Sequence, residues 1–429
     1  MTSGGRHCLR ILAAIAIGLL FGTEVYAGTL AAIRFAGNHT TQPEVMLQEM
    51  VIRPGDDIDA ARIETSRQGI MNLGLFKSVT AEVLEEEAGS VLLISVVEKW
   101  YILPIPRVGV RGDGDAEYGM ELRFDNLFGM NQRLELETIT KESLTSDTPL
   151  RRELFLGYSY PRIVGTPYQL SVGASEVMRD ERQVDEAGAE IGIYEQRSRN
   201  LRFGLYRWQT VTGPSRGLRY GGGTALQWER YRHVSGTPVL QQDARNVQLN
   251  GLLELVEVDE DRYRRRGRVY GYAPTVGLSQ LGDFGYHQHL FYYRRHLPLD
   301  EGRANLDYRF QLGLAKGMAF GLYGWTLGGS SSLRGYEKEY VTGNAMLLNN
   351  IEYLFPVSGY GQMRGVIFSD IGNAWTEAAD MDLTDLKTAV GIGLRWRVQT
   401  FVNVTIRLDH GWGLEARTQA TYLSTRTMF

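Results

Sequence analysis

The chain of 429 residues is long enough for two or three domains, or for one small domain and one large β domain. Its 50 glycines and 23 tyrosines, against 12 prolines and a single cysteine, favour an all-β protein without disulfides. The formal net charge is −4, and neither half of the chain has the strong positive charge that nucleic-acid-binding proteins show.

The first 27 residues have the pattern of a secretory signal peptide. Two arginines precede the apolar run of residues 11–22, and Val25-Tyr26-Ala27 fits a small-x-small cleavage site. Because the apolar run is too short to cross a bilayer as a helix, an uncleaved anchor is the weaker alternative. We expect residues 1–27 to be removed together with the only cysteine, Cys8.

Residues 28–100 are predicted to form a small α/β unit with the element order β-α-α-β-β. Strands are expected at residues 30–35, 79–84 and 91–97, and helices at residues 42–51 and 58–73. Asp57 or Asp59 is the expected cap of the second helix. The unit is acidic, since residues 28–103 hold six basic and eleven acidic side chains.

From residue 101 to residue 429, the sequence alternates apolar and polar side chains in segments of about ten residues. The clearest is FVNVTIRLD at 401–409, with four apolar residues on one face and polar residues on the other. Such segments are typical of transmembrane β-strands. Sixteen are predicted: 104–112, 117–126, 131–141, 150–160, 167–178, 197–210, 217–232, 244–257, 266–278, 287–296, 303–313, 345–356, 361–370, 387–397, 401–410 and 418–429.

The predicted fold is therefore an all-β transmembrane barrel of sixteen antiparallel strands, residues 101–429, preceded by the α/β unit. A soluble β-sandwich or lipocalin-like barrel is the alternative. The signal peptide, the number of segments and the alternation of short turns with long loops all favour the membrane barrel.

The stretch LGGSSSLRGY, residues 327–336, lies in the long connection 314–344. Serine- and glycine-rich segments are usually flexible linkers, so an arginine between Leu333 and Tyr336 needs an explanation. A second short motif, Phe368-x-Asp370-x-Gly372, follows in the thirteenth predicted strand. The two motifs, in this order and at these strands, resemble the (V/I/L)RG(F/Y) and F-x-D-x-G motifs of the BamA/TamA-type outer-membrane barrel-assembly superfamily.

The period of two in a β-strand suggests what Arg334 binds. Glu352 lies opposite the apolar face of its strand, and Asp370 shares a face with Phe368, so both carboxylates are expected to point into the lumen. A guanidinium can fork to carboxylates and stays charged when buried. We therefore interpret Arg334 as a latch that pins the loop to the wall, a contact that the family resemblance also implies.

The remaining motif residues are assigned supporting roles at this site. Gly335, with Gly328 and Gly329, is expected to allow a close approach of the backbone, and Leu333 and Tyr336 are expected to pack beside Phe368. Gly372 belongs to the second motif. A solvated loop without any latch is the alternative.

The resemblance implies an outer-membrane location, with residues 28–100 as a single POTRA domain in the periplasm. It implies assistance in the insertion or export of other outer-membrane proteins, through imperfect pairing of the first strand, 104–112, with the last, which ends at Phe429. The partners would be the lipid bilayer, unfolded outer-membrane or secreted proteins, and periplasmic proteins or lipoproteins that bind through residues 28–100. The small sheet of that unit is expected to accept nascent barrel substrates by β-augmentation, and a purely structural spacer is the alternative. A two-partner-type secretion pore and a passive channel or structural surface antigen are the alternatives.

No enzymatic site is expected. The sequence has no nucleophile, phosphate-binding or dinucleotide-binding motif, and His287 and His289 lack an evident third ligand for a metal. We therefore expect no cofactor, no metal and no nucleic-acid partner.

Overall fold

The computed structural model describes residues 28–110, 115–143, 151–184, 189–210, 216–239, 241–260, 265–317, 324–357, 362–402 and 404–425. The predicted signal peptide and the C-terminal Phe429 therefore lie outside the described residues. Within the described ranges, no helix is both long enough and apolar enough to cross a membrane.

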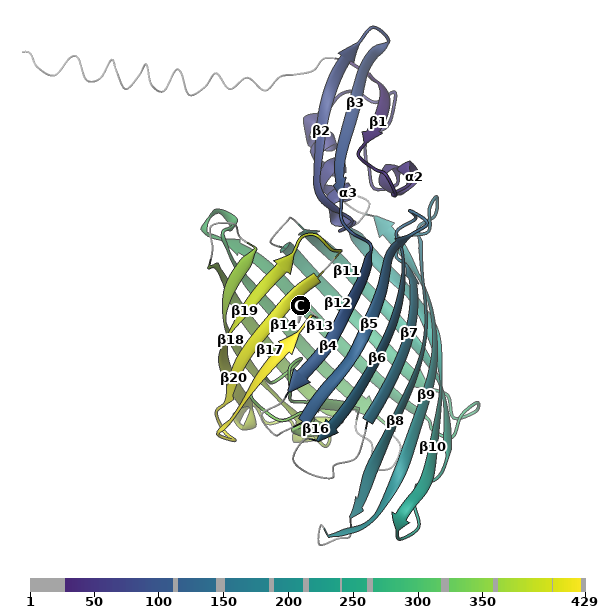
Figure 1. Ribbon diagram of the computed structural model, residues 1–429, viewed down its shortest axis with the longest axis vertical. Coiled ribbons are helices and arrows are strands. Elements are labelled where there is room, and N and C mark those ends of the chain that lie inside the picture. The colour runs from purple at the N-terminus through teal and green to yellow at the C-terminus, as the bar shows by residue number, and fades with distance from the viewer. Residues whose placement is uncertain are drawn as a thin grey trace, which may run out of the picture.

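The N-terminal unit is a three-stranded sheet with two helices (Figure 1). Its elements are β1 (Leu30–Ala36), α2 (Pro43–Leu47), α3 (Ala60–Asn72), β2 (Phe76–Glu86) and β3 (Gly89–Glu98), which confirms the predicted order. β3 lies in the centre, parallel to β1 and antiparallel to β2. The apolar faces of the sheet and helices enclose a core that includes Met46, Ile70, Phe76, Leu92 and Ile94.

The first helix is shorter than its sequence pattern predicts. α2 ends at Leu47, because the backbone amides of Val51 and Ile52 bind the side-chain oxygen of Ser66, at 3.0 and 3.3 Å, instead of continuing the helix. The second helix has the expected cap, since the carboxylate of Asp59 accepts from the backbone amide of Ala61 at 2.8 Å.

Sixteen antiparallel strands form a second sheet, which curls into a barrel (Figure 1). Each strand is a neighbour of the next along the chain, with the long connection 317–344 between the eleventh and the twelfth. This confirms the predicted fold. The strands are β4 (Ile102–Val110), β5 (Asp115–Leu127), β6 (Gln132–Ser143), β7 (Arg151–Tyr160), β8 (Tyr168–Val184), β9 (Glu190–Thr210), β10 (Gly217–Gly236), β11 (Ala244–Glu260), β12 (Arg265–Gly277), β13 (Tyr286–Leu299), β14 (Ala304–Lys316), β17 (Ala345–Pro356), β18 (Met363–Trp375), β19 (Lys387–Val398), β20 (Val404–Gly413) and β21 (Thr418–Ser424).

Strands β8, β9 and β10 extend well beyond the length that a bilayer requires. β8, β9 and β10 have 17, 21 and 20 residues, whereas β7 has 10. About 9–11 residues suffice for a tilted transmembrane strand. The excess projects beyond the other strands, at the end of the barrel away from the N-terminal unit (Figure 1).

The N-terminal unit is hydrogen-bonded to two turns at the near end of the barrel. The side chain of Asn126, near the end of β5, donates to Thr41 Oγ1 at 2.9 Å, and the backbone amide of Glu260, at the end of β11, donates to Asn72 Oδ1 at 2.9 Å. Lys99 lies at the base of the unit, where its ammonium donates to the Gly74 carbonyl at 2.7 Å. Burial, aided by the nearby positive charge of Arg397, lowers the pKa of Lys99 to about 8.

Candidate functional site

The long connection between β14 and β17 folds back into the barrel. Its described part starts with β15 (Trp325–Leu327), which pairs antiparallel with β16 (Val341–Gly343). Between them lie residues 328–336, here called the loop tip. Leu333, Arg334 and Tyr336 of the loop tip are 0%, 0% and 1% exposed, so the motif is buried inside the barrel.

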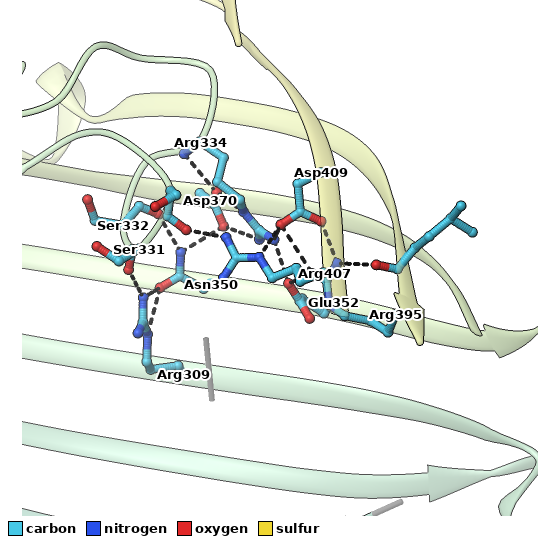
Figure 2. A network of polar contacts seen from close by, with 12 residues as sticks. Arg309, Ser331, Ser332, Arg334, Asn350, Glu352, Asp370, Arg395, Arg407 and Asp409 are labelled. Atoms are coloured by element: carbon cyan, nitrogen blue, oxygen red, sulfur yellow. Dashed lines mark hydrogen bonds and ion pairs between the residues drawn. The ribbon is translucent and has the colours of Figure 1, made fainter. Parts of the chain in front are cut away.

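The Arg334 side chain binds two carboxylates that come from neighbouring strands (Figure 2). Its Nε and Nη2 atoms fork to the two oxygens of Asp370 on β18, each at 2.7 Å, and its backbone amide adds a third bond to Asp370 at 3.0 Å. Nη1 donates to Glu352 on β17. Asp370 and Glu352 are 0% and 2% exposed, so these ion pairs lie away from bulk water. The structure thus brings together the three residues that sequence reasoning grouped.

A third carboxylate and two further arginines extend the cluster (Figure 2). Asp409 on β20 accepts from Arg334 Nη1 at 3.3 Å, and also from Arg395 on β19 and Arg407 on β20, both at 2.5 Å. Arg395 bridges to Glu352 at 2.6 Å. Sequence reasoning assigned no role to these three residues, although their alternation had placed each on a polar strand face.

Asn350 and Arg309 connect the cluster to the backbone of the loop tip. Asn350 on β17 donates to Asp370 at 2.7 Å and to the Ser332 carbonyl at 2.8 Å. Arg309 on β14 donates to Asn350 Oδ1 and to the Ser331 carbonyl, both at 2.7 Å from its Nη2 atom. The loop tip is therefore held through its backbone as well as through Arg334.

Phe368 supports the guanidinium from the second motif. The Arg334 Cζ atom lies 3.4 Å from the centroid of the Phe368 ring, a cation–π contact. Room for this ring depends on Gly391 of β19, where an added Cβ would lie 2.1 Å from the ring. At Gly372 a Cβ would lie 2.5 Å from the Leu347 carbonyl oxygen, so glycine permits the close contact between β18 and β17.

Leu333 and Tyr336 do not pack beside Phe368, so that prediction is wrong. Both belong to an apolar cluster with Leu327, Met346, Leu348, Ala374 and Ala389, whereas Phe368 packs with Leu354 and Val366. The reason is that the Arg334 side chain covers the Phe368 ring and the residues on either side of Arg334 reach other parts of the wall.

The loop tip also binds the last described strand. The Tyr422 hydroxyl of β21 accepts from the Gly335 amide and donates to the Tyr336 carbonyl, each at 3.1 Å. The Tyr336 hydroxyl donates to the Thr388 carbonyl at the start of β19, at 2.9 Å. The loop tip therefore contacts every strand from β17 to β21, and it links the arginine cluster to the end of the sheet.

Two glycines that face each other allow this close approach. Gly335 has φ of +95°, and an added Cβ would lie 2.7–2.8 Å from the backbone of residues 411–413 on β20. An added Cβ at Gly411 would lie 2.8 Å from the backbone carbon of Arg334. The backbones of the loop tip and the wall are thus in direct contact, as expected for Gly335, and Gly411 completes the contact from the other side.

We predict that Gly335→Ala loosens the loop tip by two separable effects. The positive φ alone is expected to cost about 1–2 kcal/mol, and the clash adds to it. Gly165→Ala is the control for φ, because Gly165 has φ of +75° and no atom within 4 Å of an added Cβ. Gly411→Ala tests the clash with no positive φ.

Limited proteolysis at residues 324–344 and the unfolding temperature measure these effects. Gly335→Ala and Gly411→Ala are expected to expose the loop to cleavage, whereas Gly165→Ala is expected to leave it protected. Equal protection in all three variants would contradict the close approach.

The two ends of the sixteen-stranded sheet meet without pairing. The sheet begins at β4 and ends at β21, and no ladder joins the described residues of these two strands. The contacts between them include a side-chain bond from Arg107 to Thr425. At the end near the N-terminal unit, Trp100 forms a single bridge with Phe401. This boundary between β4 and β21 is here called the seam.

A cavity of about 1450 Å³ lies in the lumen beside the seam. Its wall includes Leu103 to Arg107 of β4, residues 418–425 at the other edge, and the loop tip. Both unpaired strand edges therefore border one space inside the barrel, and the loop tip forms a third side of that space. The arrangement offers backbone groups for strand pairing.

Two family models match the chain. One, described as the Omp85 superfamily domain, matches residues 270–421, which include both motifs. The other, described as a surface antigen variable number repeat of the POTRA type, matches residues 29–99. Over 78 residues, the chain is 33% identical to the outer membrane protein assembly factor BamA of Nitratidesulfovibrio vulgaris, a match that covers 18% of this chain and 10% of that relative.

Solved structures share the fold. BamA from Haemophilus ducreyi lacking POTRA domains 1–3 superposes with a TM-score of 0.57 at 16% identity, over 92% of this chain and 84% of that chain. CdiB from Escherichia coli superposes with a TM-score of 0.62 at 17% identity, over 93% of this chain and 74% of that chain. CdiB from Acinetobacter baumannii gives a TM-score of 0.60 at 15% identity, over 92% and 73%.

Proposed function

Because the chain belongs to the Omp85 superfamily, as an outer-membrane barrel with a periplasmic POTRA domain, we propose that it assists the insertion of other outer-membrane β-barrel proteins. Barrels of this superfamily are not enzymes. The proposed activity is therefore the pairing of a substrate strand with an edge strand of this barrel, without covalent chemistry. An unfolded barrel protein would place one of its strands at the seam, and β4 or β21 would serve as the template.

The observation that carries this proposal is the unpaired seam. In the described chain, β4 and β21 have free edges toward each other, and these edges border the luminal cavity. Free backbone donors and acceptors at membrane depth are costly, because hydrocarbon offers them no partner. An incoming strand would satisfy these groups, so the seam has an intrinsic tendency to accept one.

The loop tip would act as a latch that controls the seam. It holds β21 through Tyr422, while Arg334 ties the same loop to β17, β18 and β20. As long as the latch is closed, the last strand keeps its position relative to its neighbours. Release of the latch would free β21 to move away from β4.

The POTRA domain would receive the substrate first. The strand order is β1-β3-β2, so the outer edge of β2 (Phe76–Glu86) pairs with no other described strand. An extended peptide can add to such an edge through backbone hydrogen bonds. Because the domain contacts the ends of β5 and β11, a bound peptide would be held near the periplasmic end of the barrel.

Reconstitution tests the proposal. The full mature chain in lipid vesicles is expected to accelerate the folding of several unrelated, urea-unfolded outer-membrane barrels, measured by their heat-modifiable migration on gels. The matched control is the same chain with Asp370→Asn and Arg334→Ala, which keeps the seam residues and lacks the latch. No acceleration by the intact chain would refute the proposal.

Depletion in cells separates the three candidate functions. Loss of many outer-membrane barrels is the expected result. Loss of one secreted protein, with all barrels at normal levels, would instead assign a secretion pore of the two-partner type. A change in small-solute uptake alone would assign a passive channel.

A further inference from the structure

A row of arginines crosses the outward face of the barrel at the far end from the POTRA domain. Arg152 on β7 pairs in register with Met178 on β8, Met178 with Arg197 on β9, and Arg197 with Arg230 on β10. Residues in register on adjacent strands share a face. The row therefore places Arg197 and Arg230 side by side, with Arg152 on the far side of Met178, and it is here called the arginine row.

The outward direction of this face follows from the residues nearer the middle of the membrane. With a period of two, Arg197 shares its face with Leu201, Phe203 and Leu205, which are 49%, 48% and 42% exposed. Such a band of exposed apolar side chains faces lipid in an outer-membrane barrel. The arginine row thus lies just outside the apolar band, on the same wall.

The arginines of this row form no salt bridge in the described chain, unlike neighbouring arginines, although Arg197 lies close enough to Glu195 for electrostatic attraction. Arg199 and Arg232 are paired with Glu176 and Glu195. In contrast, no salt bridge joins Arg152, Arg197 or Arg230 to any residue that the structure describes. Arg197 Nε is buried and has no hydrogen-bond partner in the described chain, and its Nη2 atom meets only the sulfur of Met178, at 3.3 Å.

The register of the arginine row also places two like charges opposite each other. Like charges directly opposite each other on neighbouring strands repel, and Arg197 and Arg230 are such a pair. An anion bound between them would turn that repulsion into attraction. Phosphate suits the position, because guanidinium groups bind it with paired, charge-assisted hydrogen bonds.

An apolar groove lies on the membrane side of the arginine row. It has a volume of about 340 Å³, and its wall is almost entirely apolar, with contributions from Leu156, Val172, Ala174, Leu201, Phe203 and Leu226. Ala174, Leu201 and Leu226 form one register row across β8, β9 and β10. Each is four residues from the arginine row along its strand, which is about 13 Å, or about 10 Å in depth at a strand tilt of about 40°.

We propose that the arginine row and this groove form one binding site for a phosphorylated lipid of the outer leaflet. The phosphate lies between Arg197 and Arg230, within reach of Arg152, and an acyl chain lies in the groove beside Ala174. Trp228, on the register row between the two parts, stands where aromatic side chains of barrels meet the interface. The extension of β8, β9 and β10 beyond the bilayer keeps the arginines on paired strands at head-group level (Figure 1).

The site would anchor the barrel in its membrane on the wall formed by β7 to β10, away from the seam. A lipid held there would fix the depth and tilt of that wall. Motion during strand insertion would then be confined to the seam side. This role is separate from the proposed insertion activity and does not depend on it.

Native mass spectrometry of the full mature chain in a neutral detergent tests the site. The probes are diphosphorylated lipid A, the same lipid without phosphates, and inorganic phosphate. We expect the intact protein to retain the diphosphorylated lipid. The double variant Arg197→Gln and Arg230→Gln is expected to bind it about 30-fold more weakly, the change that two arginine contacts at a membrane surface contribute.

Two further variants separate the parts of the site. Ala174→Phe fills the groove and is expected to weaken retention of both lipid forms. Arg179→Gln is the matched control, because Arg179 lies on the opposite face of β8 and pairs with Glu181, and it should bind like the intact protein. The heat-modifiable gel shift shows that each variant has folded.

Three outcomes would overturn the proposal. The first is equal retention of the phosphorylated and dephosphorylated lipids by the intact protein. The second is unchanged binding in the Arg197→Gln and Arg230→Gln variant. The third is binding of inorganic phosphate as tight as that of the lipid, which would make the row a site for free anions.

Discussion

Arg334→Ala is expected to destabilise the barrel by about 3–5 kcal/mol, the usual cost of leaving a buried charge without its partner. Asp370 bears most of this loss. It is 0% exposed, and its described hydrogen bonds come from Arg334 and from one other side chain, Asn350. Glu352 and Asp409 are affected less, because Arg395 still binds both.

The unfolding temperature, read from heat-modifiable migration on gels, measures the effect. Arg309→Ala is the matched control, because it removes a guanidinium from the same cluster while the three carboxylates keep their arginine partners. It is expected to cost about 2 kcal/mol, from about 1 kcal/mol for each of its two acceptors, Asn350 Oδ1 and the Ser331 carbonyl. Equal effects of the two variants would show that Arg334 is not the central charge of the latch.

A second substitution at Asp370 makes the interpretation specific. Adding Asp370→Asn to Arg334→Ala removes the stranded charge, so the double variant is expected to be more stable than Arg334→Ala alone. Arg334→Lys keeps a positive charge and loses the fork, and should lie between the intact chain and Arg334→Ala. If the double variant were instead less stable than Arg334→Ala alone, the unpaired charge of Asp370 could not be the cause of the destabilisation by Arg334→Ala.

The barrel was predictable because the membrane imposes a simple pattern. A strand with lipid on one face and water on the other must alternate apolar and polar side chains. All sixteen segments predicted from this alternation correspond to strands of the observed sheet. The extensions of β8 and β9 were not predicted. Beyond the bilayer both faces of a strand meet water, so residues 179–183 of β8 carry polar side chains on both faces, without the alternation that marks a membrane strand.

The latch was predictable only in part. Glu352 and Asp370 could be grouped with Arg334 because both lie on the polar faces of strands directly after the loop. Asp409 and Arg395 also lie on polar faces, but a period of two gives the face of a residue and not its depth in the barrel. The depth of Asp409 and Arg395 along the barrel axis depends on the register of β19 against β18 and of β20 against β19. The sequence of a single strand does not give that register.

Joining the two sides of the seam is expected to abolish the proposed insertion activity. Because the side chains of Arg107 and Thr425 are in contact across the seam, cysteines at these positions can be joined by a short, cleavable bis-maleimide linker. Cys8 is the only natural cysteine and lies in the segment expected to be removed, so in the mature chain the introduced pair reacts alone. A linked seam cannot admit a strand, whatever the state of the latch.

The folding assay with unfolded barrels in lipid vesicles measures the result. The linked protein should be no more active than empty vesicles, and cleavage of the linker should restore the activity of the unlinked cysteine variant. That variant is the baseline, because Arg107→Cys also removes ion pairs with Glu121 and Glu137.

The matched control carries cysteines at Val177 and Ser198, which are register partners within the paired strands β8 and β9. Its linker joins two strands that already share a ladder, so it should leave activity unchanged. If substrate strands pair at the open seam, the Arg107–Thr425 linker should abolish activity while the Val177–Ser198 linker should not. The reason is that a strand edge can act as a template only if it can separate from its present neighbour. Full activity with the Arg107–Thr425 linker in place would therefore mean that substrate strands are not templated at this edge.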